Sequence, residues 1–163
     1  MEITFAPKGI LQIDDARIIH RNFAGVGSLY NREGDRNFSV VIETEEQAEA
    51  LRERGWNVKI KPPREEGEGP FMFLPVKVKF SDYGPLVYLK SGKALNTLSE
   101  NTVLTLDKIS IARVDLDIRP YDWNVNGKSG RTAYLQSIMV TQNIDRFAAM
   151  YQNEQFTENE EVF

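Results

Sequence analysis

The sequence predicts a mainly β protein: a small antiparallel barrel with one or two short covering helices and a disordered acidic C-terminal tail. Several segments alternate apolar and polar residues with the two-residue period of half-buried strands, and turns containing glycine or proline separate them. Only short stretches have helical spacing. At 163 residues and 41% hydrophobic, the chain can bury the core of one domain, which we place at residues 1–151, followed by a flexible tail at residues 152–163.

The first long strand is expected at residues 10–23. Its apolar alternation changes phase at Asp14 and Asp15, as it would at a β-bulge, and such a bulge bends a strand as a small barrel requires. Alternatively, the two carboxylates belong to a metal site.

A polar connector with three glycines follows at residues 23–36. Arg32, Arg36 and Tyr30 give it side chains that could hold a ligand, so it is either a mobile binding loop or a plain surface loop. The capping-box pattern from Thr44 to Gln47 then predicts a covering helix that ends near Gly55.

The strand expected at residues 71–80 differs sharply between its two faces. All its even positions are apolar, whereas its odd positions carry two rings, a proline and two cations. The preceding strand, at residues 56–61, turns Val58 and Ile60 inward and its lysines outward, and a polar linker at residues 62–70 separates the two. Both strands therefore have one face for a core and one for a ligand.

Further along, residues 86–90 repeat the pairing of a ring and a cation with Tyr88 and Lys90. Residues 93–107 are expected to form a short helix and a turn, and residues 109–118 return to strand. Asp115 and Asp117 share a face of that strand, a spacing that Mg²⁺ could use, but the flanking arginines favour salt bridges.

Residues 119–134 are predicted to form a hairpin, because Asn126-Gly127 and Ser129-Gly130 can adopt the positive φ angles of a tight reversal. Its rim combines three aromatic rings with three cations. Flat rings interleaved with cations suit a ligand with π-faces and a phosphate backbone, which describes single-stranded nucleic acid. The alternative is a hairpin whose rings pack on the core and whose charges are only solvated.

The side chains of these loops and strand faces form the predicted nucleic-acid-binding set. It comprises Arg32, Arg36, Lys59, Lys61, Phe71, Phe73, Lys77, Lys79, Tyr88, Lys90, Arg119, Tyr121, Trp123, Lys128, Arg131 and Tyr134.

Composition argues against several other classes of function. The absence of cysteine excludes disulfides, thiolate nucleophiles and cysteine-ligated metals, and a single histidine, His20, makes a histidine metal site or a Ser-His-Asp triad improbable. We therefore expect no catalytic residue, metal or cofactor. No apolar run has the length of a membrane span and no signal peptide is recognisable, so we expect an intracellular protein that does not bind membranes.

The net charge of −4 is unusual for a protein that binds nucleic acid, but its distribution explains it. Residues 152–163 contain four acids and no base, so residues 1–151 carry equal numbers of acidic and basic side chains. The excess negative charge therefore lies in the tail.

Five blocks of sequence, in this order, resemble bacteriophage single-stranded-DNA-binding proteins, a family of OB-fold replication proteins. The most distinctive block is Arg-Pro-Tyr-Asp-Trp-Asn-Val-Asn-Gly-Lys at residues 119–128, and the others lie at residues 9–17, 31–38, 56–63 and 74–80. The resemblance spans roughly residues 3–142. It implies an OB-fold-like barrel that binds single-stranded DNA without catalysis, in the cytoplasm of a bacterial host cell. The resemblance does not decide whether the protein forms a homo-oligomer.

The tail is similar to that of bacterial and phage single-stranded-DNA-binding proteins, which often end in an acidic segment closed by phenylalanine. Val162 departs from the pattern, since many bacterial versions have proline there. The similarity implies that the tail recruits replication and recombination proteins. Its partner-binding residues would be Glu158, Glu160, Glu161 and Phe163.

Two other functions are compatible with the sequence. A metal-dependent nuclease would use the four carboxylates of the two acidic pairs, and Mg²⁺-dependent cleavage would identify it. A phage interaction protein, such as an inhibitor of host defence, would turn the aromatic rim toward a protein and would not bind oligo-dT tightly.

Overall fold

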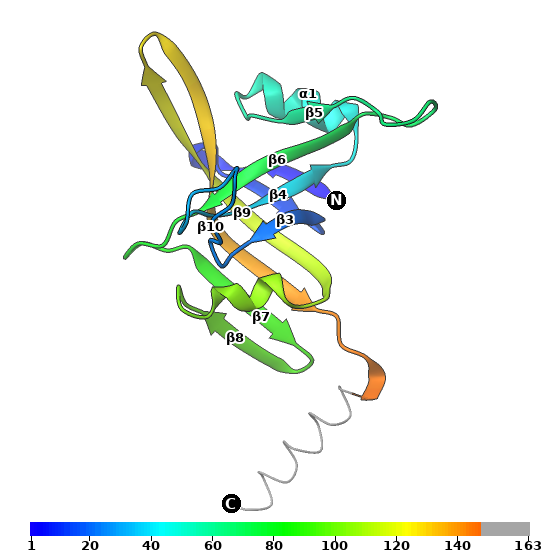
Figure 1. Cartoon of the computed structure of the whole chain (residues 1–163), viewed down its shortest axis with the longest axis vertical. Coiled ribbons are helices and arrows are strands. Elements are labelled where there is room, and N and C mark those ends of the chain that lie inside the picture. The colour runs from blue at the N-terminus through cyan, green and yellow to red at the C-terminus, as the bar shows by residue number, and fades with distance from the viewer. Residues whose placement is uncertain (148–163) are drawn as a thin grey trace, which may run out of the picture.

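The computed structural model of the chain describes residues 1–147 (Figure 1). The predicted tail and its partner-binding residues lie outside this part. Within these 147 residues, ten strands, one α-helix and two 3₁₀ turns follow one another as β1 (Glu2–Phe5), η1 (Pro7–Gly9), β2 (Leu11–Asp14), β3 (Ile18–Asn22), β4 (Arg36–Ile42), α1 (Glu45–Glu53), β5 (Lys59–Lys61), β6 (Phe71–Val78), β7 (Leu86–Ser91), β8 (Ala94–Leu98), η2 (Val103–Asp107), β9 (Ile111–Val125) and β10 (Lys128–Gln142). The predicted mainly β architecture with a short covering helix is confirmed.

All ten strands belong to one strongly twisted sheet. Its main path runs β1-β2-β9-β10-β6-β4-β3, while β5 pairs with β6, β7 with β10, and β8 with β7. Strand pairs are antiparallel except those of β10 with β6 and with β7, which are parallel. Within residues 1–147 the path ends at β1 and β3, so the sheet is open and does not close into the predicted antiparallel barrel.

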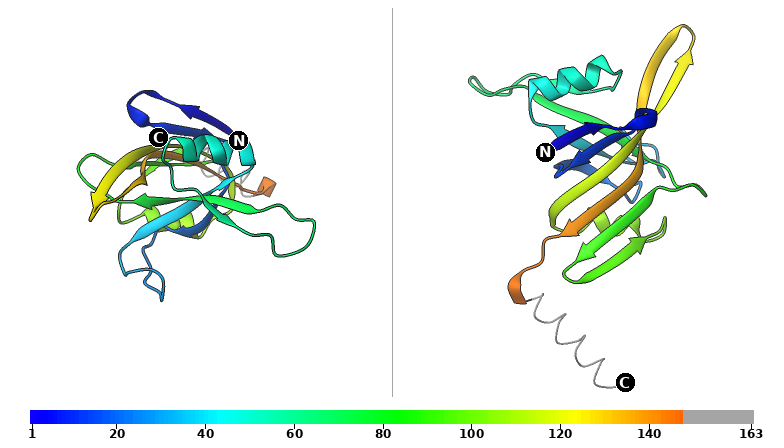
Figure 2. Two further views of the ribbon diagram at one scale, coloured as in Figure 1. Left: turned by 90° about the horizontal axis from the view of Figure 1, so that it is seen from above. Right: turned by 180° about the vertical axis from the view of Figure 1, so that it is seen from behind.

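The two longest strands organise the molecule. β9 and β10, of 15 residues each, cross the middle of the sheet as an antiparallel pair and continue beyond it as a hairpin. Figure 2 shows this hairpin projecting from the end of the molecule at which α1 lies. The central pair therefore connects the core directly to the predicted binding rim.

The core is a single cluster of apolar side chains from the strands, from α1 and η2, and from the segment after α1. The even positions of β6 are buried as predicted, and in the same cluster Phe23 stacks on Phe38 with ring centroids 5.1 Å apart. No helix among residues 1–147 is long and apolar enough to cross a membrane.

The expected first strand at residues 10–23 is in fact two strands. Asp15 has a left-handed φ of 53°, and its backbone N–H donates to Oδ1 of Asp115 at 2.9 Å. β2 before it pairs with β9, whereas β3 after it pairs with β4. The phase change in the sequence thus marks a change of strand partner rather than a bulge in one strand.

The helix α1 begins at the predicted cap but lacks half of the predicted capping box. The Thr44 hydroxyl accepts from the Gln47 backbone N–H at 3.1 Å. Oε1 of Gln47 is buried without a hydrogen-bond partner, so it does not reach back to the cap. The helix ends as expected before Gly55, whose φ of 89° favours glycine.

Two further predictions of local structure were wrong. Residues 93–107 form strand β8 and the 3₁₀ turn η2 rather than a helix, because β8 pairs with β7 along its whole length. At residues 56–61 only Lys59–Lys61 is strand, and Ile60 stays 43% exposed although it lies on the core-facing side.

Candidate nucleic-acid interface

The hairpin reverses at Asn126-Gly127, as predicted. These two residues have φ angles of 52° and 79°, and Val125 pairs directly with Lys128 on either side of them. Positive φ at both positions gives the turn the twist that the flanking strands need. The second predicted reversal, Ser129-Gly130, lies within β10 instead.

The register of β9 and β10 determines which side chains share a face, because directly opposed residues point the same way. Tyr121 pairs with Thr132, and Trp123 pairs with Gly130. This places the three predicted rings of the hairpin on one side. Together with Arg119 and Lys128 they project from the face opposite the core residues Ile118 and Ala133.

The same face continues across β6 and β5. Tyr134 pairs in parallel with Lys77, and the odd residues of β6 pair with the two lysines of β5. We call this surface the aromatic–cationic face. Its strand positions are Lys59, Lys61, Phe71, Phe73, Pro75, Lys77, Arg119, Tyr121, Trp123, Val125, Lys128, Gly130, Thr132 and Tyr134. None of these positions holds a carboxylate, although Asp117 lies on the same face of β9 two residues before Arg119. Within residues 1–147 none of the five cations of this face forms a salt bridge.

Trp123 lies across the backbone of Gly130. A Cβ atom added at Gly130 would sit 2.5 Å from Cζ2 of the indole, closer than real Cβ contacts. The glycine therefore gives the ring room to lie against the strand, while 37% of the side chain stays exposed. An indole held in this way loses little freedom when a base stacks on it.

The neighbouring rings are also held by their surroundings. Tyr121 and Tyr134 meet edge to face with centroids 6.0 Å apart, and the guanidinium of Arg119 lies 4.7 Å from the centroid of Tyr134. Tyr121 remains more than half exposed. The arrangement is a fixed aromatic platform beside a cation.

Phe73 is an exception to the predicted exposed face of β6. Only 9% of it is exposed, because His20 meets it edge to face at 5.3 Å and the Lys61 ammonium lies 5.6 Å from its ring centroid. Phe71, 39% exposed, is thus the more open ring on this strand. The sequence predicted that both rings would be exposed, and this was wrong for Phe73.

Arg131 lies on the opposite face of the hairpin from the three rings. Its guanidinium donates to both carboxylate oxygens of Asp122, at 2.7 and 3.1 Å, and to the carbonyl of Arg54 at 2.8 Å, and it lies 5.2 Å from the Trp56 ring. The hydrogen bond between them lowers the pKa of Asp122 and raises that of Arg131. Arg131 therefore fastens the hairpin to the region after α1.

Four other residues of the predicted set lie at separate places on the molecule. Arg36 pairs with Val78 on the core side, where it makes a salt bridge with Glu100 at 3.2 Å. Lys79 is exposed just beyond β6. Tyr88 and Lys90 lie further along the sheet, where β7 pairs with the far half of β10. The structure thus does not gather Arg36, Tyr88 and Lys90 with the hairpin rings.

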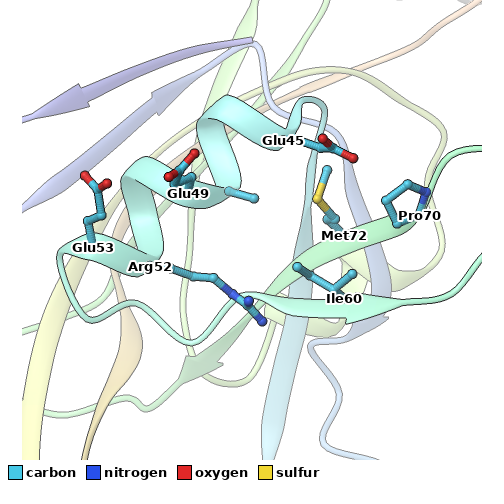
Figure 3. A pocket seen from close by; sticks show the side chains of 8 residues that line it. Glu45, Glu49, Arg52, Glu53, Ile60, Pro70 and Met72 are labelled. Carbon is cyan, nitrogen blue, oxygen red and sulfur yellow. The ribbon is translucent and has the colours of Figure 1, made fainter.

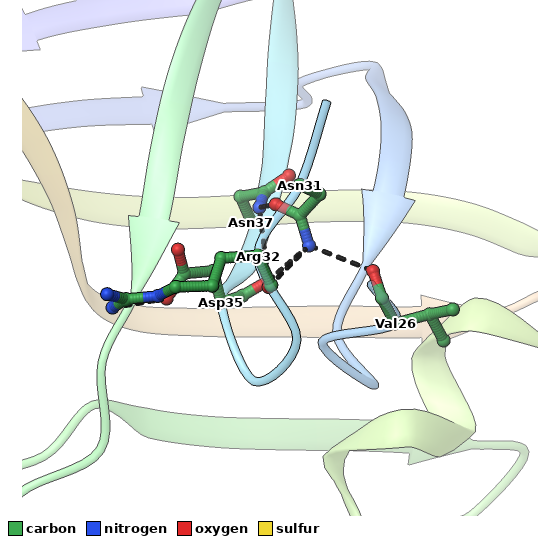
Figure 4. A network of polar contacts seen from close by, with 5 residues as sticks. All are labelled: Val26, Asn31, Arg32, Asp35 and Asn37. Carbon is green, nitrogen blue, oxygen red and sulfur yellow. Dashed lines mark hydrogen bonds and ion pairs between the residues drawn. The ribbon is translucent and has the colours of Figure 1, made fainter. Parts of the chain in front are cut away.

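The connector at residues 23–36 is tied to the face through Asn31. Its side-chain amide donates to the carbonyls of Val26 and Asp35, and its Oδ1 accepts from Asn37, as Figure 4 shows. Asn37 pairs with Lys77 across the sheet, so the connector borders the aromatic–cationic face. The side chain of Arg32 forms an exposed salt bridge with Asp35.

At its tip the connector exposes Leu29 and Tyr30, neither of which is in the predicted set, although Tyr30 was named as a connector side chain that could hold a ligand. Their exposed fractions are 88% and 94%. An apolar residue next to a tyrosine in a polar, glycine-rich segment was the available sequence signal for them.

The two acidic pairs form hydrogen bonds to each other and to neighbouring residues, instead of grouping as the ligands of a metal ion would. Partial burial acts to raise the pKa of Asp115, but hydrogen bonds from Arg113 and from the Asp15 backbone lower it overall. Asp117 accepts from the Ser137 hydroxyl at 3.4 Å. Within residues 1–147, no three carboxylates or histidines are grouped so that they could hold a metal ion.

Comparison with solved structures finds this fold in phage proteins. The single-stranded DNA-binding protein from bacteriophage Enc34 in complex with ssDNA is similar with a TM-score of 0.58 at 11% identity, over 88% of this chain and 92% of that one. A second structure of the single-stranded DNA-binding protein from bacteriophage Enc34 gives a TM-score of 0.57 at 11% identity, over 88% of this chain and 86% of that one. A C-terminal truncation of it gives 0.54 at 12% identity, over 88% and 91%. These likenesses establish the fold.

The sequence itself establishes the family. No curated protein matches this chain. The sequence profile of the phage ssDNA-binding domain, however, matches residues 3–162, nearly the whole chain. The chain therefore belongs to the phage ssDNA-binding domain family, the bacteriophage single-stranded-DNA-binding proteins that its sequence blocks resemble.

Proposed function

We propose that the protein binds single-stranded DNA across the aromatic–cationic face. The observation that carries this proposal is the continuous run of strand positions that combines open rings with cations that form no salt bridge among residues 1–147. The family of this chain and the structure of the Enc34 protein in complex with ssDNA support the same ligand.

On this surface the rings of Phe71, Tyr121, Trp123 and Tyr134 stack bases, and Lys59, Lys61, Lys77, Arg119 and Lys128 contact phosphates. Base stacking on an aromatic ring contributes about 1–3 kcal/mol per base and tolerates any sequence. Such a surface suits a protein that coats and protects single strands during phage DNA replication or recombination in the host cytoplasm. The acidic tail recruits the partner enzymes.

Titration of intrinsic tryptophan fluorescence with oligo-dT at two salt concentrations tests this proposal. The chain has two tryptophans, of which Trp56 is buried and Trp123 is on the face. We expect oligo-dT to quench the fluorescence of Trp56→Phe, which retains Trp123, with an affinity that falls as salt rises. Trp123→Phe should lose most of the quenching. If oligo-dT binds but the fluorescence of neither variant changes, the DNA contacts another surface.

A further inference from the structure

A second surface of the molecule lies between α1 and the strands β5 and β6. It is a groove of about 570 Å³, which Figure 3 shows with Arg52 extending from the helix toward Ile60. Its floor is apolar, formed by Ala48, Ile60, Pro70 and Met72. Its charged lining consists of Glu45, Glu49, Arg52 and Glu53.

The groove lies on the other side of β5 from the aromatic–cationic face. Ile60 pairs with Met72, whereas Lys59 and Lys61 on either side of it pair with phenylalanines. Because successive strand residues point to opposite faces, this short strand presents two lysines to one surface and Ile60 to the other. A molecule in the groove would therefore leave the aromatic–cationic face open.

The three glutamates occupy positions i, i+4 and i+8 on α1, so they lie along one side of the helix. Like charges at this spacing destabilise a helix. Among residues 1–147 none of the three forms a salt bridge. Arg52, the cation of the groove, donates instead to the carbonyl of Val58 at 3.0 Å. The groove thus carries an excess of negative charge beside an exposed isoleucine.

Charge complementarity selects what can occupy such a groove. The glutamates repel the phosphates of DNA, and they also repel the chain's own C-terminal segment, which has four acids and no base. We propose that the groove docks a segment of a partner protein that carries an apolar side chain flanked by lysines or arginines. The partner binds while single-stranded DNA occupies the opposite face.

A fluorescein-labelled peptide with a Leu-Leu centre flanked by lysines is the probe, and its anisotropy with the full chain is the measurement. The test variant replaces Glu45, Glu49 and Glu53 with Gln, and the matched control neutralises Glu2, Glu66 and Asp82, which are exposed on other segments. We expect the test variant to weaken peptide binding about fivefold or more, because several exposed ion pairs are lost together. The control variant should bind the peptide as the wild type does, since the acidic C-terminal segment is the same in all three proteins.

Two further arms separate groove docking from general attraction between a basic peptide and an acidic protein. Ile60→Ser should weaken binding of the Leu-centred peptide, and a peptide with a Ser-Ser centre should bind more weakly to every protein. Equal losses in the two triple variants, or equal affinity for the two peptides, would overturn the proposal.

Saturating oligo-dT should leave the peptide affinity unchanged, whereas displacement of the peptide by oligo-dT would also overturn it. The triple variant should keep wild-type affinity for oligo-dT. A failure of groove docking is therefore distinguishable from a failure of single-stranded DNA binding.

Discussion

At the scale of single residues, Trp123 is the side chain best placed to stack a base. It is fixed from below by the Gly130 backbone and exposed above the hairpin. We expect Trp123→Ala to weaken oligo-dT binding about tenfold or more, because one base loses its stacking partner. Trp123→Phe should keep much of the affinity. Fluorescence anisotropy of labelled oligo-dT measures both, and an unchanged affinity in the alanine variant would make Trp123 a packing residue only.

Gly130 is predicted to matter only through that tryptophan. In Gly130→Ala the new methyl group would collide with the indole, so we expect an affinity loss similar to that of Trp123→Ala. The double variant should lose little more, since the two changes act on the same indole. Gly69→Ala is the matched control, because a Cβ there has no atom within 4 Å. Additive losses in the double variant would contradict the coupling.

At the scale of the elements, the hairpin is held in place from the side that faces away from the proposed DNA. Arg131 joins it to Arg54 and Trp56, so Arg131→Ala should loosen the hairpin and lower oligo-dT affinity about three- to tenfold. Because Arg131 faces away from the rings, the salt dependence of binding should keep its slope, whereas Arg119→Ala should reduce it. If the slope is reduced in Arg131→Ala, Arg131 contacts a phosphate of the DNA.

The strand β6 and its extension supply two cations whose role can be read from salt dependence. Replacing Lys77 and Lys79 with alanine should lower the affinity for oligo-dT. It should also reduce the slope of log K against log salt by about 0.7 for each phosphate that the protein no longer neutralises. The matched control replaces Lys93 and Lys108, two exposed lysines outside the face, and should leave the slope unchanged. If the two pairs behave alike, net charge rather than position governs binding.

At the scale of the whole molecule, the chain divides its charge between a neutral body and an acidic end. Removing residues 153–163 deletes four carboxylates that would compete with DNA for the cations of the face. We therefore expect the truncated protein to bind oligo-dT more tightly, most clearly at low salt, where exposed charges are least screened. Titrations at two ionic strengths measure this, and equal low-salt affinities would show that the tail does not compete.

Phe163 separates the two proposed roles of the tail. Phe163→Ala should abolish capture of replication or recombination enzymes in a pull-down, yet leave the affinity for oligo-dT as in the wild type. Capture that persists in this variant would assign recruitment to another part of the chain.

Local patterns in the sequence determined much of the fold. The strict alternation of β6 predicted its buried face, the dipeptide Asn126-Gly127 predicted the turn, and Thr44 predicted the start of α1. Each depends on neighbours within a few residues, either through side-chain alternation, backbone φ or a cap hydrogen bond. These interactions join residues that are close together in the sequence, so a single sequence is enough to recognise them.

Tertiary structure decided which strands pair and, through them, which predicted site residues lie together. Alternation along one strand does not reveal its neighbour, so the partner change at Asp15 and the pairing of β8 were not predictable. The same limit hid the positions of Arg131, which fastens the hairpin from behind, and of Phe73, which His20 covers. The sequence by itself determined that rings and cations alternate along exposed strand faces. Only the register between distant strands decided which of them form one surface, because that register depends on packing across the whole sheet.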